Sequence, residues 1–545
     1  MKNIFAAFAL LSCITLSAQT VAPTPTATAR PKLVVGMVVD QMRWDFLYRY
    51  QDKYVAGGFK RLLRDGYSCE NTHINYSPSY TACGHTCVYT GSVPSVHGIT
   101  GNNWFDLKEN KYVYCTEDTT EKTVGSSSKA GLMSPRRMLT TTITDELRLA
   151  TNFRSKVIGV ALKDRGSILP AGHTANAAYF YDPSAGNWIT STYYMQELPT
   201  WVKQFNDYKL PEKYLAENWS TLQPIEKYIE STDDDEQYEG LFENETKAMF
   251  THKVSEIKPT YKILAATPFG NTVTLKFAEG VILNERMGGH DATDFLAVSL
   301  SSTDYVGHRF GPNSVETEDC YLRLDRDLAE FFTFLDEQVG AGNYLFYLTA
   351  DHGVAHVPDF SKEHKIPAGV FPIDTVMKQL ETKLKQQYGE GDWLLSFENM
   401  QLYFNNKLLE EKKIDRAAFK KTIHNFMVQF EGVAKVIDLE NLSNELLEAR
   451  MKRDISNGFY PKRSGEMYVL YEPAWFDGMD KGTTHGSVYP YDTHIPLVWM
   501  GWNVKPGEDH SDIHMTDIAP TVAAMLHIQE PNGNVGKVIE GLFKK

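Results

Sequence analysis

Residues 32–39 read KLVVGMVV and are followed directly by Asp40. This apolar, β-branched run lacks the alternation of a half-exposed strand, so it predicts a strand that is buried on both faces. Stretches with apolar residues at helical spacing, clearest at about 313–339, separate it from similar runs. This alternation predicts an α/β fold with a mostly parallel central sheet and helices on both faces. The similar runs are VIGVAL at 157–162, FLAVSL at 295–300, YLFYLT at 344–349 and IPLVWM at 495–500.

Two segments interrupt this rhythm, at about 175–290 and 360–480, and both are rich in Lys, Glu, Tyr and Asn. We therefore predict one catalytic domain over 32–545, with these two segments inserted as a cap or lobe over the sheet. The 545-residue chain is 42% hydrophobic and 23% charged, which excludes global disorder. Its formal net charge of −14 argues against a nucleic-acid-binding protein, but local cations or metal ions can still attract an anionic substrate.

The first 18 residues, MKNIFAAFALLSCITLSA, predict a signal peptide that is cleaved after Ala18. The Pro-, Thr- and Ala-rich residues after it, up to 31, predict a flexible lead. An alternative is lipid attachment at Cys13, which lies in a lipoprotein-like LLSC box. No later run reaches about 20 continuous apolar residues, so we expect no transmembrane segment. With the signal peptide, this predicts a periplasmic or secreted protein, and we expect it to be a monomer. Cys83 and Cys87 lie four residues apart and are interpreted as small buried residues rather than a metal or redox pair.

Three predicted strands end in residues that bind metals. Asp40 follows the first strand, Asp304 with His308 follows FLAVSL, and Asp351-His352 follows YLFYLT. The carboxyl ends of parallel strands meet at one edge of a sheet, so these side chains should converge there. Mixed sets of Asp and His suit a catalytic zinc site. Each pattern alone could instead be a helix cap, a solvated ion pair or a turn.

A candidate nucleophile lies in residues 77–85, SPSYTACGH, where turn residues precede a predicted helix. Hydroxyl groups at a helix N-terminus lie where backbone N–H groups favour an anion. Ser79 or Thr81 could equally be an ordinary N-cap residue.

Taken in order, these motifs resemble the alkaline phosphatase superfamily, over about residues 32–525. Within that superfamily the sequence LKDR at 162–165 is most similar to the PafA-type, phosphate-irrepressible bacterial alkaline phosphatases. The motifs are VD at 39–40, TxxGH at 81–85, HGIxGN at 97–102, DxxxH at 304–308, ADHG at 350–353, THG at 484–486 and TDIAPT at 516–521.

The resemblance implies two zinc ions and a Thr81 nucleophile that also contacts a metal. It implies that Asn102, Lys163 and Arg165 bind the phosphoryl oxygens. Only the resemblance selects His485 from the sixteen histidines, with His494 as its fallback, and it favours Thr81 over Ser79 and Asn102 over Asn103. The implied ligands are Asp304, His308 and His485 for one ion, and Asp40, Asp351 and His352 for the other.

The implied activity is the hydrolysis of small phosphate monoesters through a phospho-Thr81 intermediate. Paired cations at Lys163 and Arg165 would favour the dianion of a monoester over the monoanion of a diester. The nearest alternative is a phosphodiesterase or nucleotide pyrophosphatase of the same superfamily. A sulfatase is disfavoured because its nucleophile motif is absent around Thr81. A zinc-dependent binding or adhesion protein without catalytic activity is the alternative from another class.

Overall fold

The computed structural model describes residues 29–258, 260–478 and 481–544. The predictions for the signal peptide, for Cys13 and for residues 19–28 of the lead lie outside this part. Residues 31–545 form one compact unit. Among the described helices, none combines the length and the apolar character needed to cross a lipid bilayer.

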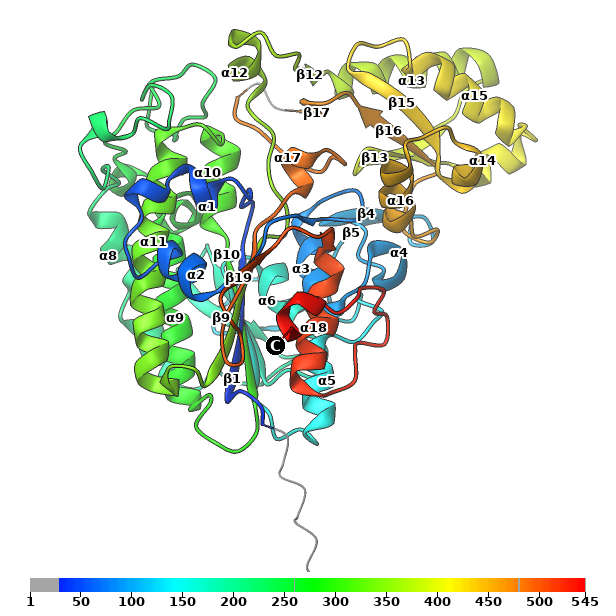
Figure 1. Cartoon of the computed structure of the whole chain (residues 1–545). Coiled ribbons are helices and arrows are strands. Elements are labelled where there is room, and N and C mark those ends of the chain that lie inside the picture. Colours follow the sequence, from blue (N-terminus) through cyan, green and yellow to red (C-terminus); the bar gives the residue numbers. More distant parts are fainter. Residues whose placement is uncertain (1–28, 259, 479–480, 545) are drawn as a thin grey trace, which may run out of the picture. The chain divides into compact units, whose positions relative to one another are not determined.

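The central sheet has the strand order β19-β2-β18-β11-β1-β10-β7-β8-β9-β6 (Figure 1). Its middle is parallel, because β1 pairs with β10 and β11, β10 with β7, and β7 with β8. Every residue of β1, β10 and β11 is buried, which explains their uninterrupted apolar sequences. The predicted α/β class with a mostly parallel sheet is confirmed. The parallel strands are β1 (Leu33–Val39), β7 (Val157–Ala161), β8 (Ala177–Asp182), β10 (Asp294–Leu300) and β11 (Tyr344–Thr349).

The flanks of the sheet differ from the prediction in two ways. The run at 495–500 forms β18 (Leu497–Gly501), which lies antiparallel to β11, because burial on both faces fixes the composition of a strand but not its direction. Two sheet strands, β8 and β9 (Asn187–Ser191), fall inside the segment 175–290 that we expected to be an insertion. The part of this segment that lies outside the sheet therefore begins after β9. The remaining strands of the sheet are β2 (Tyr67–Cys69), β6 (Thr123–Val124) and β19 (Gly507–Asp509).

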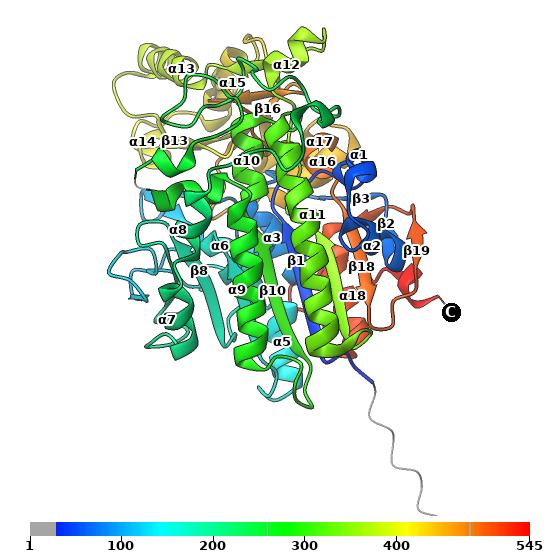
Figure 2. The ribbon, with the colours of Figure 1, turned by 90° about the vertical axis from the view of Figure 1, so that its left-hand side faces the viewer.

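Helices cover both faces of the sheet (Figures 1 and 2). One face carries α9 (Phe269–Glu285) and α11 (Val315–Leu335), and α11 lies within the helix expected at 313–339. The other face carries α3 (Thr81–Thr90), α5 (Ile143–Ala150), α6 (Asp164–Ala171) and α18 (Ile518–Leu526). Apolar residues of the sheet and of these helices except α6 form one large buried cluster, and those of α6 belong to two smaller clusters.

A smaller antiparallel sheet, with strand order β13-β14-β16-β15, forms a lobe with its own hydrophobic cluster. The lobe lies beyond the end of the central sheet at which β1 and β10 end (Figures 1 and 2). A two-stranded ribbon of β12 (Gly369–Phe371) and β17 (Trp475–Asp477) flanks it. The lobe contains β13 (Leu394–Glu398), β14 (Gln401–Phe404), β15 (Val433–Asp438), β16 (Met467–Tyr471), α13 (Ile373–Tyr388), α14 (Asn406–Glu411), α15 (Arg416–Met427) and α16 (Ala449–Gly458).

Candidate active site

The candidate site lies where the parallel strands end. Asp40 directly follows β1, and Asp304 lies in the first turn of α10 (Ser302–Phe310), just after β10. Asp351 and Lys163 follow the ends of β11 and β7. The register pairs Val39 with Leu300 in the neighbouring strand, so these ends lie level with one another. The parallel register therefore gathers residues from four distant parts of the sequence at one edge.

Two overlapping groups of side chains could hold a metal ion, each with its potential ligand atoms within 4.8 Å of one another. In the first group, Asp304 Oδ1 lies 3.1 Å from His308 Nε2 and 3.8 Å from His485 Nε2. In the second, His352 Nε2 lies 3.5 Å from Asp40 Oδ1. The groups are Asp304, His308 and His485, and Asp40, Asp304 and His352.

Asp351, a predicted ligand, borders the second group without belonging to it. Its Oδ2 lies 3.4 Å from His352 Nε2 and 3.2 Å from His85 Nδ1. Its Oδ1 accepts hydrogen bonds from the backbone N–H groups of Gln41 and His352, both at 3.1 Å. The structure thus places Asp351 beside the cluster, with one oxygen held by backbone donors and the other facing two imidazoles.

The three histidines of the cluster are oriented as metal ligands require. Each Nδ1 lies 2.7–3.0 Å from a backbone carbonyl oxygen, which can only accept, so each Nδ1 carries the proton. Each Nε2 then points toward the carboxylates and, in the neutral ring, can present its lone pair to a metal ion. Burial and the neighbouring His352 and His308 hold the pKa of His485 well below its usual value, so this ring is neutral. The carbonyls belong to Thr483 for His308, Gly353 for His352 and Ser79 for His485.

Two carboxylate oxygens of the cluster are available to a cation. Among the described residues, Asp40 Oδ1 and Asp351 Oδ2 are buried without a hydrogen-bond partner. Burying a carboxylate oxygen without a partner is costly unless a cation compensates its charge. Together with the three imidazoles, this donor set fits a divalent metal ion of the kind that prefers nitrogen and oxygen ligands.

Lys163 bridges two of the candidate ligand carboxylates. Its Nζ donates to Asp40 Oδ2 at 2.7 Å and to Asp304 Oδ2 at 2.5 Å, and the side chain is buried. Burial alone would lower the pKa of Lys163, but the two carboxylates outweigh it and raise that pKa. Burial likewise opposes the charge of Asp304, yet Lys163 and His308 hold the pKa of Asp304 well below its usual value. A buried ammonium ion therefore shares the charge of both carboxylates.

Thr81 is the first residue of α3, and its Oγ1 lies 3.4 Å from His352 Nε2. The N-cap residue is Tyr80, without a side-chain cap hydrogen bond, so neither Thr81 nor Ser79 is the N-cap. The Ser79 hydroxyl donates to the Ser487 carbonyl at 3.0 Å. Of the two candidate nucleophiles, only Thr81 therefore faces the histidine cluster with its hydroxyl oxygen.

The structure also separates Asn102 from Asn103. Asn102 Oδ1 accepts a hydrogen bond from the Ala82 backbone N–H at 2.9 Å, which fixes this amide at the start of α3. Asn103 begins β4 (Asn103–Asp106), and its side chain is exposed. Asn102 is thus the residue placed beside Thr81.

Arg165 lies in a hydrogen-bonded chain that the sequence did not reveal. Its Nη1 donates to the Tyr114 hydroxyl at 3.1 Å, and that hydroxyl donates to Asp164 Oδ1 at 2.7 Å. Thr116 donates to the other oxygen of Asp164. Asp164 therefore orients Arg165 through Tyr114, at the end of β5 (Lys111–Tyr114).

Gln41 is a second residue that sequence reasoning missed. Its side chain donates to Asp304 Oδ1 at 2.8 Å, and its backbone is left-handed, with a φ of 67°. A Cβ at position 307 would lie 2.0 Å from Gln41 Oε1, which explains the glycine inside the DxxxH motif. In the sequence, this glycine was a signal that another side chain packs against the motif.

Other candidate residues from the sequence lie outside the cluster. His494 Nε2 donates to the Glu70 carbonyl at 2.9 Å, and its ring stacks on Trp44, so the fallback ligand is a structural residue. Cys83 and Cys87 are buried thiols within α3. Among the described residues, no candidate metal group contains a cysteine, which agrees with their interpretation as small buried residues.

Comparisons with known proteins identify the family. Residues 34–503 match the family model of type I phosphodiesterases / nucleotide pyrophosphatases. The chain is 49% identical to alkaline phosphatase PhoV of Synechococcus elongatus, over 100% of both chains. It is also 49% identical to a protein of Myroides odoratus named calcium-transporting ATPase, over 94% of each chain.

A solved structure extends this likeness to three dimensions. The crystal structure of wild-type alkaline phosphatase PafA matches with a TM-score of 0.91 and 48% identity, over 94% of this chain and 99% of that one. The chain therefore belongs to the type I phosphodiesterase / nucleotide pyrophosphatase family of the alkaline phosphatase superfamily, among its PafA-type alkaline phosphatases.

Proposed function

We propose that this protein hydrolyses phosphate monoesters to an alcohol and inorganic phosphate, with Thr81 as nucleophile, in the periplasm or outside the cell. The observation that carries the proposal is the position of the Thr81 hydroxyl, 3.4 Å from a neutral histidine nitrogen in a cluster of buried carboxylates. The names of the relatives PhoV and PafA support the same activity.

We propose zinc as the metal, with two ions per chain. Asp304, His308 and His485 would hold one ion, and Asp40, Asp351 and His352 the other, beside Thr81. Bound zinc would supply Lewis acidity, which stabilises an alkoxide nucleophile and a leaving oxygen at neutral pH. Because two carboxylates now share the charge of Lys163, metal binding there would release this ammonium ion toward the substrate.

The residues of the chain would carry out two displacements. Thr81 Oγ1 loses its proton and bonds to phosphorus, while the bond from phosphorus to the alcohol oxygen breaks and that oxygen takes up a proton. Water then bonds to phosphorus and breaks the bond to Thr81, which gives inorganic phosphate and restores the hydroxyl. Two displacements predict net retention of configuration at phosphorus.

Three donors would stabilise the phosphoryl oxygens. The Asn102 amide lies at the start of α3, where the backbone N–H groups also favour an anion. Arg165, held by Tyr114, adds a permanently charged guanidinium. With Lys163, the site presents two cations, which suits the dianion of a monoester better than the monoanion of a diester.

The name of the family model supports a second candidate, the hydrolysis of phosphodiesters or nucleotide pyrophosphates. The name of the Myroides relative makes ATP a further substrate to assay, because release of its terminal phosphate uses the same phosphoryl chemistry. All three activities would use Thr81. They differ in how much the two cations contribute.

The test compares kcat/KM for phenyl phosphate and for its methyl diester, with ATP as a third substrate, on the zinc-loaded protein. A large preference for the monoester supports the proposal, and a preference for the diester supports the second candidate. Thr81→Ala should lower monoester hydrolysis by several orders of magnitude and leave the zinc content unchanged. The matched control is Ser79→Ala, which should keep most of the activity. Near-native turnover by Thr81→Ala would exclude the covalent mechanism.

A further inference from the structure

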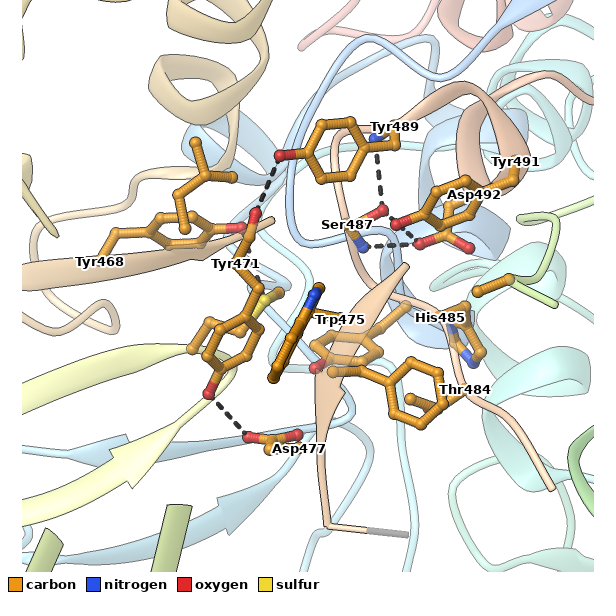
Figure 3. Close-up of a pocket in the computed structure, with 15 residues that line it drawn as sticks. Tyr468, Tyr471, Trp475, Asp477, Thr484, His485, Ser487, Tyr489, Tyr491 and Asp492 are labelled. Carbon is orange, nitrogen blue, oxygen red and sulfur yellow. Dashed lines mark hydrogen bonds between the residues drawn. The ribbon is translucent and has the colours of Figure 1, made fainter. Parts of the chain in front are cut away.

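An aromatic pocket lies between the candidate site and the lobe (Figure 3). Seven of its 15 lining residues carry a phenyl, phenol or indole ring. Rings so arranged offer flat apolar faces, on which another planar ring can stack.

The pocket adjoins the candidate site through two of its lining residues. One is His485, whose Nε2 faces Asp304 (Figure 3), and the other is Tyr80, the neighbour of Thr81 in the sequence. The two rings meet edge to face, with centroids 5.6 Å apart. Gly486 has a φ of +125°, and a Cβ there would lie 3.0 Å from the Tyr80 ring. The chain thus makes room for Tyr80 at the border of pocket and site.

Trp475, on β17, is the largest ring of the pocket and is held in a fixed position. A Cβ at Gly369 or Gly432 would lie 2.5 or 2.2 Å from its indole, so the backbone at both glycines packs directly on the ring. In Figure 3 the indole stands in the middle of the pocket, between Tyr471 and His485. A side chain held in this way can stack on a ligand with little loss of conformational entropy.

Each carboxylate of the pocket has a protein partner on one of its oxygens. Asp492 Oδ2 accepts from the Ser487 hydroxyl at 2.6 Å, and Asp477 Oδ2 accepts from the Tyr471 hydroxyl at 3.3 Å. The Tyr489 hydroxyl donates to the Tyr471 carbonyl at 2.8 Å. Among the described residues, Asp492 Oδ1 is buried without a hydrogen-bond partner, so the pocket offers ring faces and one acceptor oxygen for recognition.

We infer that this pocket binds the alcohol part of the substrate and favours phosphate monoesters whose alcohol carries a planar aromatic ring. The inference rests on the proposed function, because it places the phosphoryl group at Thr81 and the ring between Trp475 and Tyr80. A simple aryl alcohol and a nucleoside share this chemistry.

The test measures kcat/KM for benzyl phosphate and methyl phosphate, two esters of primary alcohols, in the wild type and in Trp475→Leu. We expect the wild type to prefer benzyl phosphate, and Trp475→Leu to lower the benzyl-to-methyl ratio about tenfold, the loss of one stacked ring. Turnover of methyl phosphate and inhibition by inorganic phosphate should stay unchanged, which shows that the variant is folded. The matched control is Phe426→Leu, a half-buried ring on α15 of the same lobe, which should leave the ratio unchanged.

A second pair of substrates, adenosine 5′-monophosphate and ribose 5-phosphate, distinguishes the two kinds of aromatic alcohol. A Trp475-dependent preference within this pair identifies a nucleoside pocket, and one confined to the benzyl pair identifies an aryl pocket. If the wild type hydrolyses both esters of each pair and Trp475→Leu changes neither ratio, the inference is wrong and the proposed function stands. If the wild type hydrolyses none of them, the proposed function itself fails.

Discussion

The catalytic cluster, the two candidate metal groups that we propose to be catalytic, contains the same residue types as a second cluster around His252 but uses histidine in the opposite way. In the second cluster, His252 Nδ1 lies 2.8 Å from Glu245 Oε1, and its Nε2 lies 3.1 Å from Glu316 Oε1. In the catalytic cluster, each histidine has one nitrogen on a backbone carbonyl and the other free to face carboxylates. Both clusters are buried, so burial alone does not set them apart.

The histidines of the two clusters differ in the charge of the group that contacts Nδ1. Burial opposes protonation of His252, but Glu245 and Glu316 outweigh it and raise the pKa of His252 to about 9. Its ring then carries protons on both nitrogens and has no lone pair for a metal. A backbone carbonyl fixes one proton without adding charge, so His485 stays neutral and can bind a metal. The partner of Nδ1 thus distinguishes His352 and His485, whose pKa values burial lowers, from His252. At His308, by contrast, Asp304 outweighs burial and raises the pKa.

The strongest test of this comparison removes the carboxylate that both candidate metal groups share. Asp304→Asn should lower the zinc content by at least one ion per chain and kcat/KM on a monoester by more than about 1000-fold. The reason is that Asp304 contacts His308, His485 and Lys163, so its charge serves both groups. Elemental analysis of the purified variant measures the metal, and steady-state kinetics measures the activity.

The matched control for Asp304→Asn is His494→Gln. His494 lies on Trp44 and the Glu70 carbonyl, outside the cluster, so this variant should keep its zinc and its activity. Full zinc content together with full activity in Asp304→Asn would contradict the assignment of the cluster as the metal site.

The catalytic cluster was largely accessible from the sequence because strand ends carry positional information. A buried parallel strand is a continuous apolar run, and the charged residue after it must lie at the edge of the sheet, which located Asp40, Asp304 and Asp351. His485 is different, because it lies in a loop far along the chain with no strand before it to fix its position. Only the family resemblance selected it, and the structure places its Nε2 3.8 Å from Asp304.

Other parts of the molecule had no such signal. Tyr114 and Gln41 act through hydrogen bonds to residues distant in sequence, and neither residue type is diagnostic of a site. The strands β8 (AAYFYD) and β9 (NWITS) lie near one side of the central sheet and lack the continuous aliphatic run of the inner strands, so they resembled part of an insertion. His252 pairs with Glu316 across 64 residues, a contact that tertiary folding alone creates.

A smaller effect is expected at the edge of the catalytic cluster, where Arg165 contributes charge without binding metal. Arg165→Ala should lower monoester hydrolysis by about 100-fold, or about 3 kcal/mol, and diester hydrolysis by clearly less, with the zinc content unchanged. Tyr114→Phe keeps the guanidinium but removes the hydroxyl that orients it, so we expect a loss of about tenfold. The kcat/KM values of both variants on phenyl phosphate and its methyl diester measure this. Equal losses on the two substrates would rule out the assigned role of Arg165.

The smallest effect on activity is expected at the second cluster, where His252→Gln should change stability but neither zinc content nor turnover. The folded-state pKa of His252, about 9, lies above the unfolded value of about 6.5, so protonation stabilises the fold. This contribution, at most about 3 kcal/mol, is complete below pH 6.5 and is lost as the pH rises through 9. Urea unfolding of the wild type and His252→Gln should therefore show a gap in unfolding free energy that is larger at pH 6 than at pH 10.

Nearby acids such as Glu239, whose pKa burial and Glu316 raise to about 10, titrate in both proteins, so most of their effect cancels in the gap. A gap that does not change with pH, or a loss of zinc in His252→Gln, would show that the two clusters do not differ in this way.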